Sequence, residues 1–263
     1  MMISTACSVD RWYLNNPLRN YNYLLTNPQK RHSLIVDPTS PEPYISTIEK
    51  HHFTVEAILL THAHNDHIAG VQALVKRYQC PVYAAFTETR YFHVDRLVKN
   101  REKITFKTSE AEVIATPGHT ASHVGYYFKS EAILFCGDTL FAAGIGNAKD
   151  PSADLGDLYQ SMIILGRLPE MTKIYPAHDY FENNLKFALS VDPTNQNYQS
   201  WYQKVKGIPA EQKPVTTIAD EWQMNIFMHA DSLSLQEVLA EKSVHLNNPE
   251  AVFRYLRSQK DAF

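Results

Sequence analysis

Cysteine is scarce in this 263-residue sequence, which contains only three: Cys7, Cys80 and Cys136. They are widely separated and odd in number, so the sequence predicts neither a disulfide framework nor a cysteine-based zinc motif. Free thiols of this kind are typical of a reducing compartment. A chain of 263 residues is long enough to bury a hydrophobic core without covalent cross-links.

A large net charge and a long apolar stretch are also missing. The formal net charge is −3, whereas a general nucleic-acid-binding protein usually carries a basic excess. No apolar run is long enough to span a bilayer, and the first residues lack the basic head and apolar stretch of a secretory signal. We therefore expect a cytoplasmic protein with neither a nucleic-acid nor a membrane partner. The composition indicates no particular oligomeric state.

Short apolar runs separated by turn residues fill the first two thirds of the chain and predict alternating strands and helices. Strands are expected at residues 21–25, 33–36, 57–61, 81–85, 103–106, 113–115, 123–128, 132–135 and 173–175. Helices are expected at 44–52, 69–78 and 155–168, and then at 182–191, 196–205, 235–242 and 249–260. Strand-like runs largely disappear after residue 178. The pattern favours a layered α/β body, residues 1–172, followed by a smaller helical domain, residues 173–263.

Histidine is abundant, with twelve in the chain, and one dense group follows the strand expected at 57–61. The segment His62-Ala63-His64-Asn65-Asp66-His67 holds four possible metal ligands within six residues. Imidazole and carboxylate groups bind Zn²⁺ and other first-row metal ions. Four such residues crowd a single tetrahedral ion, so the spacing indicates two ions that share this loop.

Three further candidate ligands also stand at the ends of expected strands: His119, Asp138 and His178. Ligands delivered by strand ends onto one rim would form a rigid site for two metal ions. His123 lies four residues after His119 and is expected to contact a metal ligand rather than to bind the metal itself. Surface or structural roles are expected for five histidines in polar or helical surroundings: His32, His51, His52, His93 and His245.

These motifs resemble those of the metallo-β-lactamase superfamily and, more narrowly, those of the hydroxyacylglutathione hydrolases, also called glyoxalase II. The similar segments are LLTHAHNDHIAG (59–70), ATPGHTASHVGYYF (115–128), FCGDTLFAAGIG (135–146), YPAHDYFENNLKFA (175–188) and the closing VFRYLRSQKDAF (252–263). The resemblance implies an αββα sandwich followed by a helical domain. That domain would contribute His178 and part of the substrate pocket.

The resemblance also implies a ligand assignment. The first metal would be held by His62, His64 and His119, and the second by Asp66, His67 and His178. Asp138 would bridge the two ions. This donor set suits zinc first, and iron or manganese as well.

The implied reaction is thioester hydrolysis, with Asp66 and Asp138 as the catalytic residues. Two divalent ions lower the pKa of a bridging water and supply hydroxide at neutral pH. A thiolate leaving group needs no general acid, because a thiol has a pKa of only ~8.5.

The glutathione-binding region is expected to be altered. After the Gly-x-Gly turn the family carries an arginine or lysine, but this chain has Asn147, followed by Lys149. In the helical domain an expected arginine is replaced by His229. A neutral side chain does not replace a charge-assisted contact to a carboxylate. The candidate substrate-binding residues are therefore Tyr180, Asn147, Lys149, Lys186 and His229.

Other activities are compatible with the metal motif alone. One group comprises a lactonase, a β-lactamase, a nuclease, or a thioesterase for a thiol other than glutathione. The net acidic charge disfavours the nuclease, and the helical tail favours the thioesterase branch. A mononuclear iron enzyme resembling the persulfide dioxygenases is a second alternative. An inactive, metal-bound binding module is a third.

Overall fold

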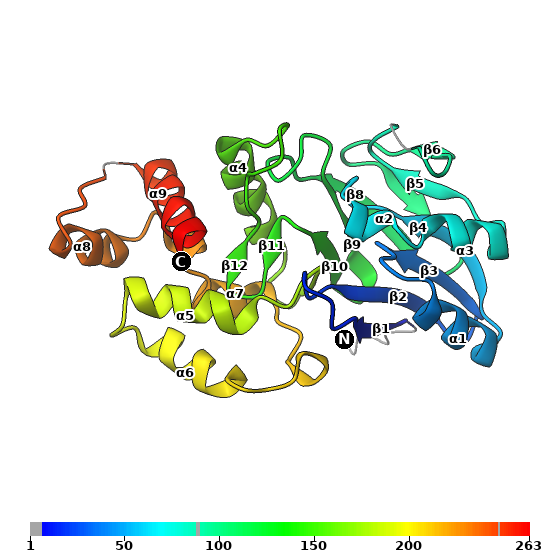
Figure 1. Cartoon of the computed structure of the whole chain (residues 1–263), viewed down its shortest axis with the longest axis horizontal. Coiled ribbons are helices and arrows are strands. Elements are labelled where there is room, and N and C mark those ends of the chain that lie inside the picture. Colours follow the sequence, from blue (N-terminus) through cyan, green and yellow to red (C-terminus); the bar gives the residue numbers. More distant parts are fainter. Residues whose placement is uncertain (1–6, 88–89, 247) are drawn as a thin grey trace. The chain divides into compact units, whose positions relative to one another are not determined.

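The computed structural model describes residues 7–87, 90–246 and 248–263 (Figure 1). It divides into two compact units: residues 1–115 with 122–137, and residues 116–121 with 138–263. The chain passes between the units at three points, after residues 115, 121 and 137. The boundary predicted at residue 173 lies within the second unit, at the start of a strand.

The first unit opens with a sheet that combines antiparallel and parallel strands. Its strands run in the order β1-β2-β3-β4-β5-β6. The β1, β2 and β3 strands pair antiparallel, and β3 to β6 pair parallel. Their bounds are β1 Ser8–Tyr13, β2 Tyr21–Asn27, β3 His32–Val36, β4 Thr54–Leu59, β5 Val82–Ala84 and β6 Arg96–Leu97.

Helices α1 (Glu42–His51), α2 (Asn65–Ile68) and α3 (Val71–Tyr78) accompany this sheet. The buried residues Tyr44 and Ile48 of α1 and Leu74 of α3 join strand residues in one hydrophobic cluster. The blue and cyan helices therefore form a layer against the sheet (Figure 1). Both parallel crossovers β3–α1–β4 and β4–α3–β5 place a loop at the carboxyl end of a strand.

The second sheet of this unit is an antiparallel meander. It contains β7 Lys103–Thr105, β8 Glu110–Ala115, β9 Val124–Phe128 and β10 Ile133–Gly137. The rings of Tyr23 on β2 and Phe135 on β10 lie 5.5 Å apart, and Tyr126 on β9 donates a hydrogen bond to the Leu60 carbonyl. These contacts join the two sheets face to face, so the unit has a helix–sheet–sheet layering.

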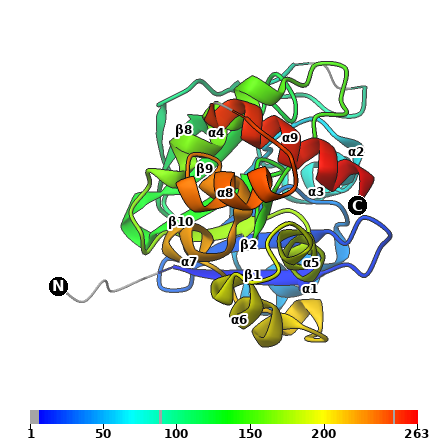
Figure 2. The ribbon, with the colours of Figure 1, turned by 90° about the vertical axis from the view of Figure 1, so that its left-hand side faces the viewer.

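The second unit is mainly helical. Its strands are β11 (Leu140–Phe141) and β12 (Gly144–Ile145), which form a hairpin, and β13 (Lys173–Pro176). Its helices are α4 Leu155–Gly166, α5 Phe181–Val191, α6 Gln196–Val205, α7 Ile218–Met224, α8 Leu233–Glu241 and α9 Pro249–Ala262. Figure 2 views α5 to α9 from the front. Phe181, Trp201 and Met224 pack α5, α6 and α7 around a common core.

The predicted elements are confirmed apart from their ends and a few omissions. The helix expected at 69–78 is α3, which begins at Val71, and a separate short helix, α2, precedes it and includes Asp66 and His67. The sequence prediction missed α2, β1, β6, α7 and the β11–β12 hairpin. Strands of two residues are too short for any periodic pattern to appear. The seven residues of α7 rest on a capping box between Thr217 and Asp220 rather than on a long apolar stripe.

Candidate metal centre

The first unit carries four of the predicted ligands in one cluster at the end of β4. His62 Nε2 lies 3.0 Å from His64 Nδ1. The His67 ring lies 4.0 Å from the His62 ring, and His67 Nε2 is 3.5 Å from Asp66 Oδ2. The sequence HAHNDH thus folds into a strand-end turn that runs into the short helix α2.

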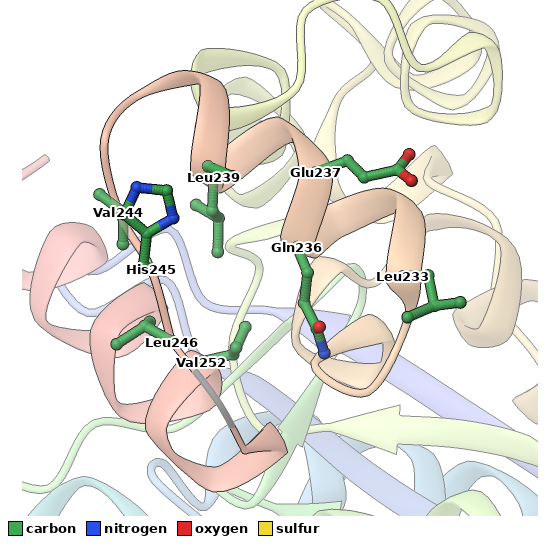
Figure 3. A pocket seen from close by; sticks show the side chains of 9 residues that line it. Leu233, Gln236, Glu237, Leu239, Val244, His245, Leu246 and Val252 are labelled. Atoms are coloured by element: carbon green, nitrogen blue, oxygen red, sulfur yellow. The ribbon is translucent and has the colours of Figure 1, made fainter.

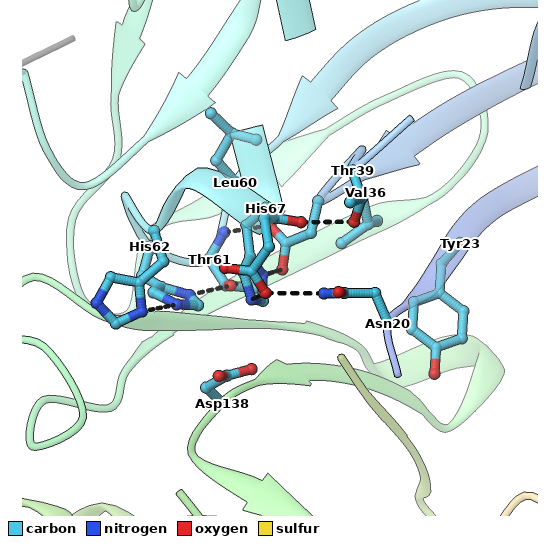
Figure 4. A network of polar contacts seen from close by, with 12 residues as sticks. Asn20, Tyr23, Val36, Thr39, Leu60, Thr61, His62, His67 and Asp138 are labelled. Atoms are coloured by element: carbon cyan, nitrogen blue, oxygen red, sulfur yellow. Dashed lines mark hydrogen bonds and ion pairs between the residues drawn. The ribbon is translucent and has the colours of Figure 1, made fainter. Parts of the chain in front are cut away.

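The carboxylate of Asp37, which the sequence analysis did not single out, is buried and hydrogen-bonds to residues of this cluster. Asp37 follows β3, and its Oδ1 accepts the Thr61 backbone N–H at 2.8 Å. Its Oδ2 accepts hydrogen bonds from Thr61 Oγ1 at 2.6 Å and His67 Nδ1 at 3.1 Å. The Thr61 hydroxyl in turn lies 3.0 Å from His62 Nδ1 (Figure 4). One carboxylate therefore fixes the ring orientation of two histidines.

Two more residues support the same cluster. Asn20 is buried, points into the network in Figure 4, and donates from Nδ2 to Asp66 Oδ2 at 2.9 Å. The ring of His123 stacks on that of His62, with centroids 4.9 Å apart. His123 was expected to contact a ligand rather than a metal ion, and it contacts His62, a predicted ligand. Asn20 gave no sequence signal, whereas Asp37 ends a strand as the predicted ligands do.

The second unit carries the other three predicted ligands. Asp138 follows β10 and points its two carboxylate oxygens at different histidines. Oδ2 lies 3.4 Å from His119 Nε2, and Oδ1 lies 3.2 Å from His178 Nε2. A carboxylate in this position can bridge two ions.

Local structure fixes both histidines of this group. His119 Nδ1 donates to the Asn147 carbonyl at 2.8 Å, which leaves Nε2 as the nitrogen that faces Asp138. Gly118 precedes His119 with a φ of 128°, and a Cβ there would collide with the backbone of Leu158. Next to His178, the buried Asp179 pairs with Lys213 at 2.8 Å.

The donor atoms fit divalent metal ions. Two ligands on one tetrahedral zinc, each with a bond of ~2.0 Å, stand ~3.3 Å apart. The pairs His62–His64, Asp66–His67, His119–Asp138 and His178–Asp138 are separated by 3.0, 3.5, 3.4 and 3.2 Å. In three of the histidines the other ring nitrogen meets an oxygen of the protein, as metal-binding histidines usually require.

The predicted substrate-binding residues all belong to the second unit, but their surroundings differ. Tyr180 stacks on His178 with ring centroids 5.2 Å apart, and Asn147 holds His119 through its carbonyl. Lys186 pairs with Glu182 on the exposed side of α5, at 2.8 Å. Lys149 Nζ, also exposed, lies 3.9 Å from Asp261.

The fifth residue, His229, lies beside the rings of Tyr198 and Trp222. Burial lowers the pKa of His229 below its usual value, which favours the neutral imidazole.

A hollow of about 460 Å³ opens between α8 and the start of α9 (Figure 3). Apolar residues form most of its wall, among them Leu233, Leu239, Val244 and Val252. None of the five predicted substrate-binding residues lines it. The hollow therefore does not correspond to the predicted substrate site.

Among the described residues, no helix has the length and apolar character needed to cross a bilayer.

Two family models together match residues 16–263. The model of the metallo-beta-lactamase superfamily covers residues 16–178, and that of the hydroxyacylglutathione hydrolase C-terminus covers residues 179–263.

Individual relatives and solved structures are also similar to this chain. The chain is 42% identical over 224 residues to the hydroxyacylglutathione hydrolase of Francisella tularensis subsp. novicida, with 85% of this chain and 88% of the relative covered. It is 39% identical over 234 residues to the enzyme of the same name from Francisella philomiragia, covering 89% and 92%. Among solved structures, the B3 metallo-beta-lactamase BLEG-1 aligns with a TM-score of 0.64 and 27% identity, covering 84% of this chain and 99% of that one.

Proposed function

The chain belongs to the hydroxyacylglutathione hydrolases of the metallo-β-lactamase superfamily, and from this premise we propose that it hydrolyses thioesters at a centre of two metal ions. The predicted fold class, an α/β metallo-β-lactamase fold followed by a helical domain, is confirmed. Membership also makes the protein a metal-dependent hydrolase. The number of ions, the thioester substrate and the nucleophile are the parts that we propose.

The placement of Asp138 carries the proposal. Its two oxygens face two different histidines within one unit, at 3.4 and 3.2 Å. A carboxylate that served one ion would not need both oxygens directed at imidazole nitrogens. The arrangement supports a first metal on His119 and a second on His178, with Asp138 shared between them.

The first unit by itself presents two close pairs of donor atoms, His62–His64 and Asp66–His67. The family resemblance assigns the first pair to the first metal and the second pair to the second. Two bound divalent ions would lower the pKa of a water between them toward ~7 and polarise the thioester carbonyl. Zinc suits these donors best, and iron or manganese is compatible.

The remaining steps fall to side chains of the chain itself. Asn20 donates a hydrogen bond to one oxygen of Asp66 and so fixes the orientation of this carboxylate, which would bind a metal ion and orient the nucleophile. Asp37 holds the Nδ1 proton of His67 and keeps Nε2 available as a ligand atom. No proton donor is needed for the leaving group, because a thiol with a pKa of only ~8.5 can leave as its thiolate.

The substrate is a small thioester, and we propose that the predicted helical domain, residues 173–263, supplies part of its pocket. Tyr180 stacks on the ligand His178 and is the substrate-binding candidate nearest to the chemistry. Asn147 and His229 replace cations expected from the family, and the lowered pKa of His229 keeps it neutral. These substitutions support a preference for a thiol less acidic than glutathione.

Metal analysis of protein purified without chelators tests the binuclear centre. We expect about two ions per chain, as for other two-metal sites. Asp138→Ala should bind less metal, and its kcat/KM should fall by more than about 100-fold. This loss exceeds that expected for residues that only hydrogen-bond to a metal ligand. Asp157→Ala, on an exposed position of α4, is the matched control and should retain both its metal and its activity.

A metal content that never exceeds one ion under metal-replete conditions would contradict the binuclear centre. It would instead favour the mononuclear iron alternative. An Asp138→Ala variant that keeps both metals and substantial turnover would remove the bridging role.

A further inference from the structure

The β11–β12 hairpin adjoins every predicted ligand of the second unit. It begins two residues after Asp138. The Asn147 carbonyl, just after β12, accepts the hydrogen bond from His119 Nδ1 at 2.8 Å. The ring of Phe141 on β11 meets the ring of His178 edge-on, with centroids 5.8 Å apart. A shift of this hairpin would therefore move all three ligands.

The backbone of the hairpin turn is held by side chains from the helical part of the chain. Asn184 on α5 donates to the Ala142 carbonyl at 3.0 Å, and the Ala143 N–H donates to Glu221 on α7 at 2.9 Å. Asn225 donates to the Gly144 carbonyl at 3.0 Å. Arg257 on α9 donates to the Ile145 carbonyl at 3.1 Å.

The turn needs this support because its backbone is strained. Ala143 has a φ of 58°, a left-handed conformation that costs an alanine ~1–2 kcal/mol. Such strain persists only where the surroundings fix the residue from several sides. The hydrogen bond from the Ala143 N–H to Glu221 is one of these constraints.

Glu221 is the centre of the support. Its side chain is fully buried, and its Oε1 accepts from Thr216 Oγ1 at 2.8 Å. Its Oε2 accepts from Asn225 Nδ2 at 3.0 Å in addition to the Ala143 N–H. Burial raises the pKa of Glu221 to about 8. A buried acid is costly, so its three hydrogen bonds are needed to keep it in place.

We infer that Glu221 and Asn225 are positioning residues of the metal centre: they hold the β11–β12 hairpin so that His119, Asp138 and His178 keep their ligand geometry. The inference rests on the proposed function, because it assigns these residues a role toward the metal ions. It also explains why a segment far from the ligand motifs in sequence, residues 216–225, is packed against the turn.

Metal affinity measures this role directly. We would titrate zinc into metal-free protein against a chromophoric chelator and record thermal unfolding of the same metal-free samples. Glu221→Ala should weaken zinc binding by about 10-fold or more, in the range found for groups behind metal ligands. Glu221→Gln should restore most of the affinity, because its amide oxygen can still accept from Ala143 and its NH₂ can donate to Thr216.

Two further variants separate positioning from general stability. Asn225→Ser keeps an acceptor for the Phe227 N–H but is too short to donate to Gly144, so zinc binding should weaken while the protein remains folded. Leu235→Ala removes a buried side chain of α8, which lies outside the hairpin and is not among the residues described above as hydrogen-bonding to it. It should lower the unfolding temperature and leave zinc affinity unchanged.

The outcomes distinguish the two proposals. If the wild-type protein binds fewer than two ions, the proposed function fails before any variant is compared. If the wild type binds two ions and folded Glu221→Ala and Asn225→Ser bind zinc as tightly, the positioning role is overturned. If Glu221→Ala does not fold, Asn225→Ser and Glu221→Gln are compared instead. Weaker zinc binding by Asn225→Ser, with nearly unchanged binding by Glu221→Gln, then supports the positioning role.

Discussion

At the scale of single residues, the candidate metal centre depends on the oxygen atoms that hold the imidazole rings. Asp37 does this for His67 directly and for His62 through the Thr61 hydroxyl, and the Asn147 carbonyl does it for His119. A ring held at Nδ1 presents Nε2 in a fixed direction. Hydrogen bonds of this kind orient imidazole rings for the metal ions that we propose.

Asp37→Asn should weaken the centre without removing a ligand. The amide can place an NH₂ group where His67 or Thr61 now donates, so one donor would face another donor. We expect zinc affinity and kcat/KM to fall by about 10- to 100-fold, the range for such supporting groups. Chelator competition and steady-state kinetics on the same preparation measure both.

Asp95→Asn is the matched control for this substitution. Asp95 also accepts a backbone hydrogen bond in the first unit, from Val82 at 2.9 Å, but it does not contact the ligand cluster in any described bond. Its variant should keep wild-type affinity and activity. Equal behaviour of the two variants would show that Asp37 has no special relation to the metal.

At the scale of elements, short turns rather than long strands set the positions of the candidate ligands. Gly118 in the TPGHT turn has a φ of 128° and lies against the start of α4, where Leu158 leaves no room for a Cβ. The Gly118 carbonyl also accepts the Asp154 backbone N–H at 3.0 Å, just before α4. His119 thus takes its place from the packing of a turn against a helix.

Gly118→Ala should therefore cost more than backbone strain alone. Gly207 provides the control, because its φ is 71° and nothing lies within 4 Å of an added Cβ. Gly207→Ala should lose ~1–2 kcal/mol of unfolding free energy and keep its metal. Gly118→Ala should lose more stability and also bind zinc more weakly. Urea denaturation and zinc titration give the two quantities, and equal losses in both variants would contradict the steric argument.

Glu221 on α7 should make the stability of the folded protein depend on pH. Burial raises the pKa of Glu221 to about 8 from an ordinary value of 4.5, and the neighbouring charge of Asp220 acts in the same direction. Between these values the folded chain keeps a proton that the unfolded chain releases, so this residue makes stability fall as pH rises. Above about pH 8, Glu221 is ionised in both the folded and the unfolded chain, and stability falls no further on its account.

The measurement compares urea denaturation of the wild type and Glu221→Gln from about pH 5 to about pH 9, where other titrating groups cancel in the difference. We expect the glutamine variant to gain stability relative to the wild type as pH rises. Parallel curves would mean that Glu221 titrates normally in the folded protein.

At the scale of the whole molecule, we assign the metal chemistry and the choice of thiol to different residues. The seven candidate ligands are those that the family resemblance implies, whereas Asn147 and His229 stand where the resemblance implies cations that hold glutathione. Each lost hydrogen bond to a charged group removes roughly 1.5–3 kcal/mol of binding. The hydrolytic centre can thus remain intact while thiol specificity changes.

We therefore expect a kcat/KM for S-lactoylglutathione below ~10⁵ M⁻¹s⁻¹, with faster turnover of thioesters of smaller or less acidic thiols. A panel of thioesters and lactones, assayed at fixed metal content, provides the comparison. Asn147→Lys should raise the value for the glutathione substrate specifically. An efficient wild-type reaction with S-lactoylglutathione would show that other side chains bind glutathione in place of the missing cations.

Much of this fold was predictable because its signals are local. The strand at 57–61 is a continuous apolar run, and the helices at 196–205 and 249–260 begin at recognisable caps, Asn195 and Asn248. The hairpin at 140–145 and helix α7 were not predicted. Their stability comes from partners such as Glu221 and Ala143, which are 78 residues apart in sequence.

The sequence by itself determined which residues are candidate metal ligands, because histidines and carboxylates that end apolar strands are recognisable without any knowledge of their neighbours. Only the tertiary structure decided what holds them. Asp37 and Thr61 are 24 residues apart, and their hydrogen bonds exist because β3 and β4 pair in parallel and bring the two strand ends together. Support of this kind depends on long-range packing, and no local pattern encodes it.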